Sequence, residues 1–357
     1  MTFDLQNIVR PNILRLKPYS TARSEFAGEA EIFLDANENA FVSPAGPGLN
    51  RYPDPLQTKL KARVSELNGV PPSSIFVGNG SDEAIDLLFR IFCEPGRDSC
   101  VICPPTYGMY KVSADINDIT VREVSLKNDF QLNVARILES MDERTRLIFI
   151  CSPNNPTGNL MRREDVIEIA HSLNGIVVVD EAYIHFANED SCINELKDLP
   201  NMVVLQTFSK AWAMAGLRIG LAFASAEIIG LMNRVKPPYN VSGIAQQAAL
   251  KALENLDEIG SWVRESLRER DRLVEAMKRF DFVVNIYPTD ANFVLIRTTD
   301  ADGVYQHLIR ERIIVRNRSN VELCEGCLRI TVGTFDENAR LLNALSGFET
   351  KKLGADR

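Results

Sequence analysis

Between about residue 70 and residue 225, short apolar runs alternate with amphipathic stretches. The runs are continuously apolar, which is typical of strands that are buried on both faces. They lie at residues 75–77, 101–103, 147–150, 176–179 and 202–205. Between them, residues 83–92 and 164–173 each place their apolar side chains on one helical stripe. The pattern predicts an α/β domain in which a mostly parallel sheet is covered by helices on both faces.

A different pattern follows residue 238. A long, charge-rich helical stretch runs to about residue 280, and short strands and helices come after it. We therefore expect a large domain over residues 46–255 and a smaller α+β domain over residues 256–357. Residues 1–45 contain several prolines and little periodicity, so we expect an N-terminal arm that packs with the smaller domain.

Composition and charge exclude several classes of protein. The chain has 357 residues, 45% hydrophobic and 25% charged, which indicates a folded protein. A formal net charge of -8 opposes non-specific binding to nucleic acid or to anionic lipid, so any anionic ligand must meet a local cluster of cations. No apolar run is long enough to span a membrane, and the first residues do not resemble a secretory signal. We expect a cytoplasmic location.

Two pairs among the seven cysteines have C-x-x-C spacing, Cys100/Cys103 and Cys324/Cys327. The first pair falls in a predicted strand, where residues three apart point to opposite faces. The second pair has no nearby residue that would complete a tetrahedral ligand set. We therefore expect no metal site.

Polar residues and glycines follow four of the predicted strands. Ligands bind beyond the carboxyl ends of parallel strands, so these segments should converge on one crevice. The first segment, residues 78–81, is a glycine turn before a helix, which presents backbone N–H groups to a phosphate. The other three segments are residues 152–158, 180–183 and 209–210.

Each segment alone has an ordinary structural explanation. The turn at residues 78–80 lacks the third glycine of a dinucleotide fingerprint and the lysine of a P-loop. Asp180 could cap a helix, and Lys210 could lie in a solvated loop, although the apolar residues after Lys210 would tend to bury it and lower its pKa. Together, a buried lysine, an aspartate, a tyrosine and a phosphate cradle are what pyridoxal 5′-phosphate requires.

Residues 209–220 resemble the lysine signature of the fold-type I class I/II aminotransferases. Asn-Pro-Thr-Gly at 155–158 and Asp-Glu-Ala-Tyr at 180–183 occur in the order and at the separations of that family. The resemblance covers nearly the whole chain and implies a seven-stranded, mostly parallel sheet in the large domain. Within the family, further motifs are similar to those of the histidinol-phosphate aminotransferase branch; they lie at residues 34–39, 51–55, 104–110 and 328–334.

The resemblance implies a role for each matching residue. Lys210 would form the Schiff base with pyridoxal 5′-phosphate and move a proton, and Asp180 would pair with the pyridinium nitrogen. Tyr183 and Asn155 would hold the phenolate oxygen of the cofactor. Its phosphate and ring would be held by Gly80, Ser81, Asp82, Tyr107, Ser209 and Arg218.

The resemblance also implies a partner and a substrate site. Tyr52 would reach the cofactor phosphate of a partner subunit, so the active unit would be a homodimer. Substrate would be bound by Tyr19, Asn37, Arg316 and Arg329. The two arginines would take the phosphate of one substrate and the carboxylate of the other.

The implied activity is a step of histidine biosynthesis. L-Histidinol phosphate and 2-oxoglutarate would give imidazole acetol phosphate and L-glutamate. Two other enzymes on the same scaffold are alternatives: a broad aromatic amino acid aminotransferase, and a lyase resembling threonine-phosphate decarboxylase. A regulatory protein that keeps the fold without the chemistry is disfavoured because Lys210 is present and the chain is acidic.

Overall fold

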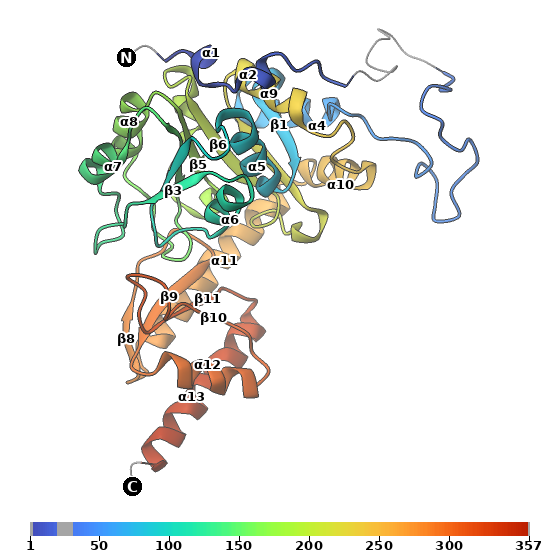
Figure 1. The fold of residues 1–357 in the computed structure, drawn as a ribbon. Helices are drawn as coiled ribbons and strands as arrows, with labels where there is room; N and C mark the ends of the chain where they lie inside the picture. The colour runs from blue at the N-terminus through green and yellow to red at the C-terminus, as the bar shows by residue number, and fades with distance from the viewer. Residues whose placement is uncertain (1–2, 20–30, 356–357) are drawn as a thin grey trace.

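The computed structural model describes residues 3–19 and 31–355. Figure 1 shows a large α/β body above a smaller body, and α11 (Leu256–Met277) runs from the first into the second. No helix among these residues is long and apolar enough to cross a lipid bilayer.

The large body contains a seven-stranded sheet with the strand order β1-β7-β6-β5-β4-β2-β3. β7 is antiparallel to both of its neighbours, and the other neighbouring pairs are parallel. The strands are β1 (Ile75–Asn79), β2 (Ser99–Ile102), β3 (Thr120–Glu123), β4 (Thr145–Cys151), β5 (Ile176–Asp180), β6 (Met202–Thr207) and β7 (Ile219–Phe223). The fold class expected from the sequence is confirmed.

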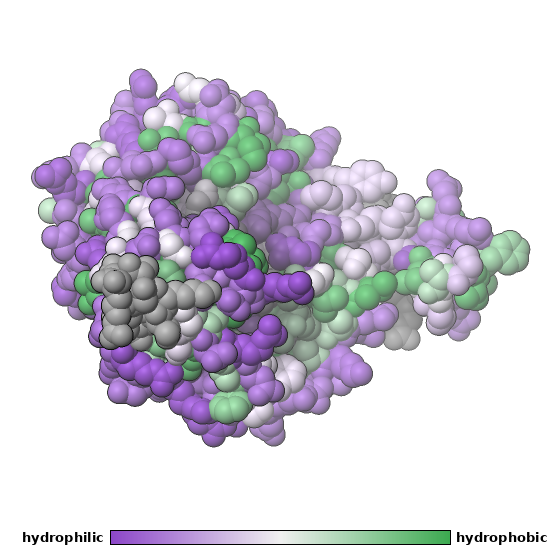
Figure 2. All heavy atoms as spheres, turned by 90° about the horizontal axis from the view of Figure 1, so that it is seen from below, coloured by the Kyte–Doolittle hydropathy of each residue, from purple (hydrophilic) through white to green (hydrophobic). Residues whose placement is uncertain are grey.

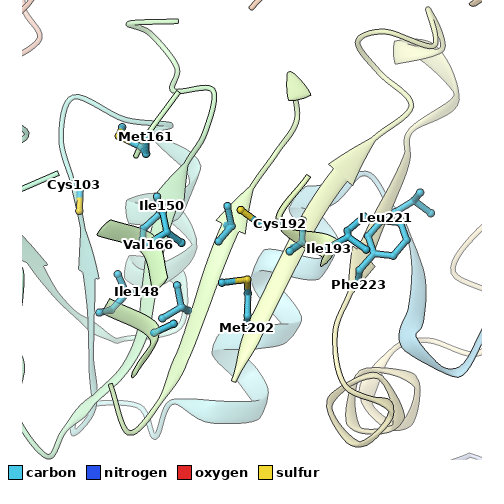
Figure 3. Close-up of a cluster of buried hydrophobic side chains, with 14 of the residues drawn as sticks. Cys103, Ile148, Ile150, Met161, Val166, Cys192, Ile193, Met202, Leu221 and Phe223 are labelled. Carbon is cyan, nitrogen blue, oxygen red and sulfur yellow. The ribbon is translucent and has the colours of Figure 1, made fainter. Parts of the chain in front are cut away.

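Helices cover both faces of this sheet. One face packs against a cluster that includes Leu60, Val166 and Ile169, and Figure 3 shows Ile148 and Met202 of the sheet within that cluster. Its helices are α4 (Thr58–Asn68), α7 (Val134–Ser140), α8 (Arg163–Ser172) and α10 (Gly243–Leu253). The other face packs against α5 (Ser81–Phe92), α6 (Met109–Ile116) and α9 (Ala226–Val235). Among the described residues, four short 3-10 helices lie in connections, at Pro72–Ser74, Ile184–Phe186, Cys192–Lys197 and Ala215–Leu217.

The smaller body is built on a four-stranded antiparallel sheet with the order β10-β11-β9-β8. Its core contains side chains from α11 and from the two C-terminal helices. Its elements are β8 (Val283–Ile286), β9 (Phe293–Thr298), α12 (Ala301–Arg310), β10 (Arg316–Asn317), β11 (Cys327–Thr331) and α13 (Phe335–Ala355). Antiparallel strands with helices packed beside them are an α+β arrangement.

The N-terminal segment has two parts in the structure. Its first part forms α1 (Leu5–Ile8) and α2 (Pro11–Leu14), and Ile8 and Ile13 are buried against the helices of the large sheet. Its second part, residues 31–50, extends away from both bodies (Figure 1). The domain boundaries at 45/46 and 255/256, and the packing of the arm with the smaller domain, stay predictions.

Gly220 on β7 lies opposite Gly78 on β1 and against the turn that begins α5. A Cβ atom at Gly220 would overlap backbone atoms of Gly80 and Ser81, which cannot move as a flexible side chain can. The two chain segments therefore approach each other closely only because residue 220 has no side chain.

We expect Gly220→Ala to lower the free energy of unfolding by about 1–3 kcal/mol through overpacking. The matched control is Gly230→Ala on α9, where an added Cβ meets no atom within 4 Å. That control should raise stability by about 0.5–1 kcal/mol, because alanine is favoured over glycine inside a helix. Thermal and urea unfolding measure both variants, and a Gly220→Ala protein as stable as wild type would contradict the close approach.

Candidate active site

A cavity of about 560 Å³ lies between the carboxyl ends of the parallel strands and the smaller sheet. Its walls come from segments far apart in the sequence, as the convergence of parallel strand ends predicts. The site residues expected from the sequence that line it are Gly80, Ser81, Asp82, Tyr107, Asn155, Asp180, Tyr183, Ser209, Lys210, Arg218, Arg316 and Arg329.

Three further expected residues do not line this cavity. Asn37 and Tyr52 line a second cavity of about 590 Å³, where the ring of Tyr52 stacks on Tyr239 with 4.4 Å between centroids. Asn79 and Leu217 also line the second cavity, and their chain neighbours Gly80 and Arg218 line the first. Tyr19 is 76% exposed and lines neither. The roles of Asn37, Tyr52 and Tyr19 stay predictions.

Asp180 is the last residue of β5 and is buried. The Tyr110 hydroxyl donates a hydrogen bond to Oδ2 at 2.7 Å, and the backbone N–H of Ala182 donates to Oδ1 at 3.1 Å. Burial raises the pKa of Asp180 to about 6, although these two hydrogen bonds oppose the rise. A carboxylate in this position gains from any ligand that presents a positively charged N–H group to it.

Lys210 follows β6 and opens onto the same cavity. Its side chain is exposed, while the next residue, Ala211, is buried. The apolar residues after Lys210 therefore do not cover it, contrary to our expectation. Partial enclosure and the charge of Arg329 nevertheless lower the pKa of the Lys210 amine, against the opposite effect of Asp180.

Tyr183 and Asn155 lie side by side near the lysine. The Asn155 amide Nδ2 donates to the Tyr183 hydroxyl oxygen at 3.4 Å, and Arg329 donates to the Asn155 side-chain carbonyl. The ring of Tyr183 lies 5.5 Å from Lys210 Nζ, and burial raises the pKa of its hydroxyl. The hydroxyl therefore stays protonated at neutral pH and can donate to an anionic oxygen.

The start of α5 forms an anion cradle. Gly80, the N-cap residue, has a φ of 80°, and the helix has no side-chain cap. A Cβ atom at Gly80 would lie 2.7 Å from Nη2 of Arg218, so the residue leaves room beside that guanidinium. Ser81 and Ser209 line the same wall. Free N–H groups, hydroxyls and a guanidinium together fit a phosphate.

Asp82 connects the anion cradle at the start of α5 with the ring of Tyr107. Its carboxylate accepts hydrogen bonds from the Tyr107 hydroxyl at 3.1 Å and from Arg218 Nη2 at 3.2 Å. The Tyr107 ring meets Tyr110 edge-on with 5.5 Å between centroids. These hydrogen bonds and ring contacts thus orient both the guanidinium of Arg218 and the ring of Tyr107.

Sequence reasoning missed two residues of the site. Tyr110 contacts Asp180 from inside α6, where its periodic position indicates only a core residue. Arg318 lines the cavity beside Arg316 and Arg329, although an arginine at the end of a strand is equally well explained as a solvated side chain. The available signals were the second tyrosine of residues 107–110 and the alternation of arginines at 316 and 318.

The model of the family "Aminotransferase class I and II" matches residues 26–345. The chain belongs to this family. It is 53% identical to the histidinol-phosphate aminotransferase of Parabacteroides distasonis over 97% of this chain and 99% of the relative. The resemblance drawn from the sequence is thereby confirmed.

Two solved structures have the same fold. The histidinol-phosphate aminotransferase of Clostridium acetobutylicum has a TM-score of 0.79 and 25% identity, covering 85% of this chain and 92% of that one. The enzyme from Sinorhizobium meliloti, solved in complex with pyridoxal-5′-phosphate, also has a TM-score of 0.79, with 24% identity and coverage of 88% and 90%.

The buried carboxylate predicts a pH dependence of stability. Because the pKa of Asp180 is raised from 3.8 to about 6, the folded cofactor-free protein binds a proton more tightly than the unfolded chain. Its stability should fall as pH rises from about 4 to about 6. Asp180→Asn removes this loss, so the variant should be more stable above pH 6, by about 3 kcal/mol, and equal to wild type below about pH 4.

Thermal unfolding of the cofactor-free proteins between these pH values measures the effect. The matched control is the exposed Asp142, where a hydrogen bond from Arg122 lowers the carboxyl pKa. Its stabilisation is present at neutral pH and is lost at low pH, so Asp142→Asn should destabilise the neutral protein. An Asp180→Asn protein less stable than wild type at pH 8 would rule out a buried, unpaired carboxylate.

Proposed function

We propose that this protein is a pyridoxal-phosphate-dependent transaminase that converts L-histidinol phosphate and 2-oxoglutarate to imidazole acetol phosphate and L-glutamate. The observation that carries the proposal is a single cavity lined by the anion cradle of the large body, by three arginines of the smaller body, and by Lys210 and Asp180. The names of the relatives support the same reaction.

The residues present fit the cofactor. When bound, pyridoxal phosphate supplies a ring that accepts the electrons of a carbanion. The α5 N-terminus, Ser81, Ser209 and Arg218 would hold its phosphate, and Gly80 would leave the space for it. Asp82 acts through its neighbours, because its two hydrogen bonds orient Tyr107 and Arg218.

The remaining residues would hold the pyridine ring and the atoms at which the reaction takes place. The Asp180 carboxylate would keep a proton on the ring nitrogen, and the hydroxyl of Tyr183 and the amide of Asn155 would donate to the ring oxygen. The Lys210 amine would hold the cofactor covalently before substrate binds. Because its pKa is lowered, the free amine would be suited to accept the proton from the substrate Cα atom and to donate it to the carbon of the cofactor that carries the amino group.

The part of the cavity that we assign to the substrate lies against the smaller sheet. Arg316 on β10 and Arg329 on β11 are opposite each other in the strand register and line the cavity. We assign them to the phosphate of histidinol phosphate in one half of the cycle and to a carboxylate of the keto acid in the other. Tyr19 and Asn37 are assigned to the same substrates on the resemblance alone.

A homodimer is part of the proposal. The extended segment exposes Ile32, Leu34, Phe41 and Val42, and green hydrophobic side chains are visible along it in Figure 2. Such a surface favours cover by another chain. Tyr52 does not line the first cavity of its own chain, and on the resemblance we assign it to the cofactor phosphate of a partner subunit. A cytoplasmic location is also proposed, because the substrates are small charged metabolites.

The direct test follows the visible absorption of the cofactor-loaded protein as L-histidinol phosphate is added without a keto acid. We expect the band of the lysine-bound cofactor to disappear and to return when 2-oxoglutarate is added. Lys210→Ala should lack both the band and turnover. L-Phenylalanine and threonine phosphate are the comparison donors, and a band that responds to one of them but not to histidinol phosphate would overturn the substrate assignment.

Subunit mixing tests the role of Tyr52. Lys210→Ala and Tyr52→Ala subunits are each expected to be defective. A heterodimer of the two has one site with both residues intact if Tyr52 acts across the interface. Random mixing should then restore roughly a quarter of wild-type activity, since half of the dimers are heterodimers with one intact site each.

The control mixture combines Lys210→Ala with Asp180→Asn. Both residues line the cavity of one chain, so every site in the mixture lacks one of them and no activity should return. If the Lys210→Ala and Tyr52→Ala mixture also stays at the level of its parents, Tyr52 does not act in trans.

A further inference from the structure

We propose that Arg318 is a third cation of the substrate anion site and that it makes this site prefer a doubly charged phosphate over a singly charged carboxylate. This inference rests on the proposed function, because it concerns the same cavity. It adds a specificity-determining residue to the arginines already assigned.

The placement of Arg318 follows from the strand register. Arg316 pairs with Arg329 across β10 and β11, and the backbone N–H of Arg318 donates to the carbonyl of Cys327 at 2.9 Å. Arg316 and Arg318 are two residues apart on an extended chain, so their side chains leave the same face. All three arginines line the first cavity.

The protein does little to offset the positive charge of these three arginines. Among the described side chains, Arg316 and Arg318 form no ion pair, and the Nε atoms of Arg318 and Arg329 are buried without a hydrogen-bond partner. The hydrogen bond from Arg329 goes to the neutral amide of Asn155. Burial and the charges of Arg329 and Arg316 lower the pKa of Arg318 to about 10, so it remains charged at neutral pH.

Like charges that face each other across paired strands are destabilising. In a chain of net charge -8, three such groups on one wall indicate that a ligand offsets them. A phosphate monoester carries a charge of about -1.5 to -2 at pH 7 and three acceptor oxygens. A carboxylate carries a single charge and two oxygens, which one forked arginine can satisfy. A third arginine therefore strengthens the binding of a phosphate more than the binding of a carboxylate.

Arg318 is better suited than Arg316 to make this distinction. Arg316 is exposed, whereas Arg318 is half-buried and lies within electrostatic reach of Tyr183. Solvent and salt screen an exposed charge more than an enclosed one. The discrimination between a dianion and a monoanion should accordingly depend mainly on Arg318.

The test uses the cofactor-loaded protein and two simple anions, propyl phosphate and butanoate, whose binding is followed by the change in cofactor absorbance without turnover. In Arg318→Gln we expect the dissociation constant for propyl phosphate to rise roughly tenfold or more, which corresponds to the loss of one charge-assisted hydrogen bond. The dissociation constant for butanoate should change by less than about threefold. The ratio kcat/KM should fall by the same factor for histidinol phosphate and little for glutamate.

Two variants guard against a change in folding. Arg318→Lys keeps the charge and the stem and should retain an intermediate preference for propyl phosphate. Arg310→Gln removes an exposed arginine at the end of α12, outside the cavity, and should leave the binding of both anions unchanged. The proposal would be overturned if Arg318→Gln weakened the binding of both anions equally, or if it weakened the binding of neither.

The proposed function can fail separately. If propyl phosphate binds in an Arg318-dependent way but histidinol phosphate is not transaminated, the substrate assignment falls and the role of Arg318 stands. If wild-type protein transaminates histidinol phosphate but shows no preference for propyl phosphate over butanoate, the role of Arg318 falls alone.

Discussion

The buried carboxylate of Asp180 is the constraint on which the rest of the cavity depends. It lies at the end of the central strand β5, where transfer from water disfavours its charged form. Tyr110 and the backbone of Ala182 supply two hydrogen bonds, which only partly offset that cost. The protein therefore retains an acceptor that is best satisfied by a cationic N–H group, such as the protonated pyridine nitrogen in the function that we propose.

The position of that carboxylate depends in turn on the sheet. Parallel strands bring the ends of β4, β5 and β6 to one edge, and the antiparallel β7 passes close to the turn that begins α5. The cradle, the lysine and the aspartate are thus held by backbone rather than by long side chains. The smaller sheet then contributes arginines across the cavity, so the site exists only where the two sheets meet.

The sequence predicted the parts of the site that follow from strand geometry. Asp180, Lys210 and the turn at Gly80 each follow a buried apolar run, and parallel strand ends must converge. Tyr110 was missed because a helical tyrosine that packs on Phe149 has the same pattern as any core residue. The strands β3 and β7 were also missed, because β3 is half-exposed at the edge of the sheet and the apolar run of β7 is interrupted by Gly220 at its second residue.

The two anion sites that we propose in the cavity are built differently, and the difference suits a cycle in which one ligand stays and others exchange. At the cradle, Asp82 offsets the charge of Arg218, and backbone N–H groups at fixed positions provide the remaining attraction. On the opposite wall, the attraction comes from long arginine side chains without carboxylate partners among the described residues. Fixed dipoles suit one phosphate of constant position, whereas flexible cations can reach substrates of different length and charge in turn.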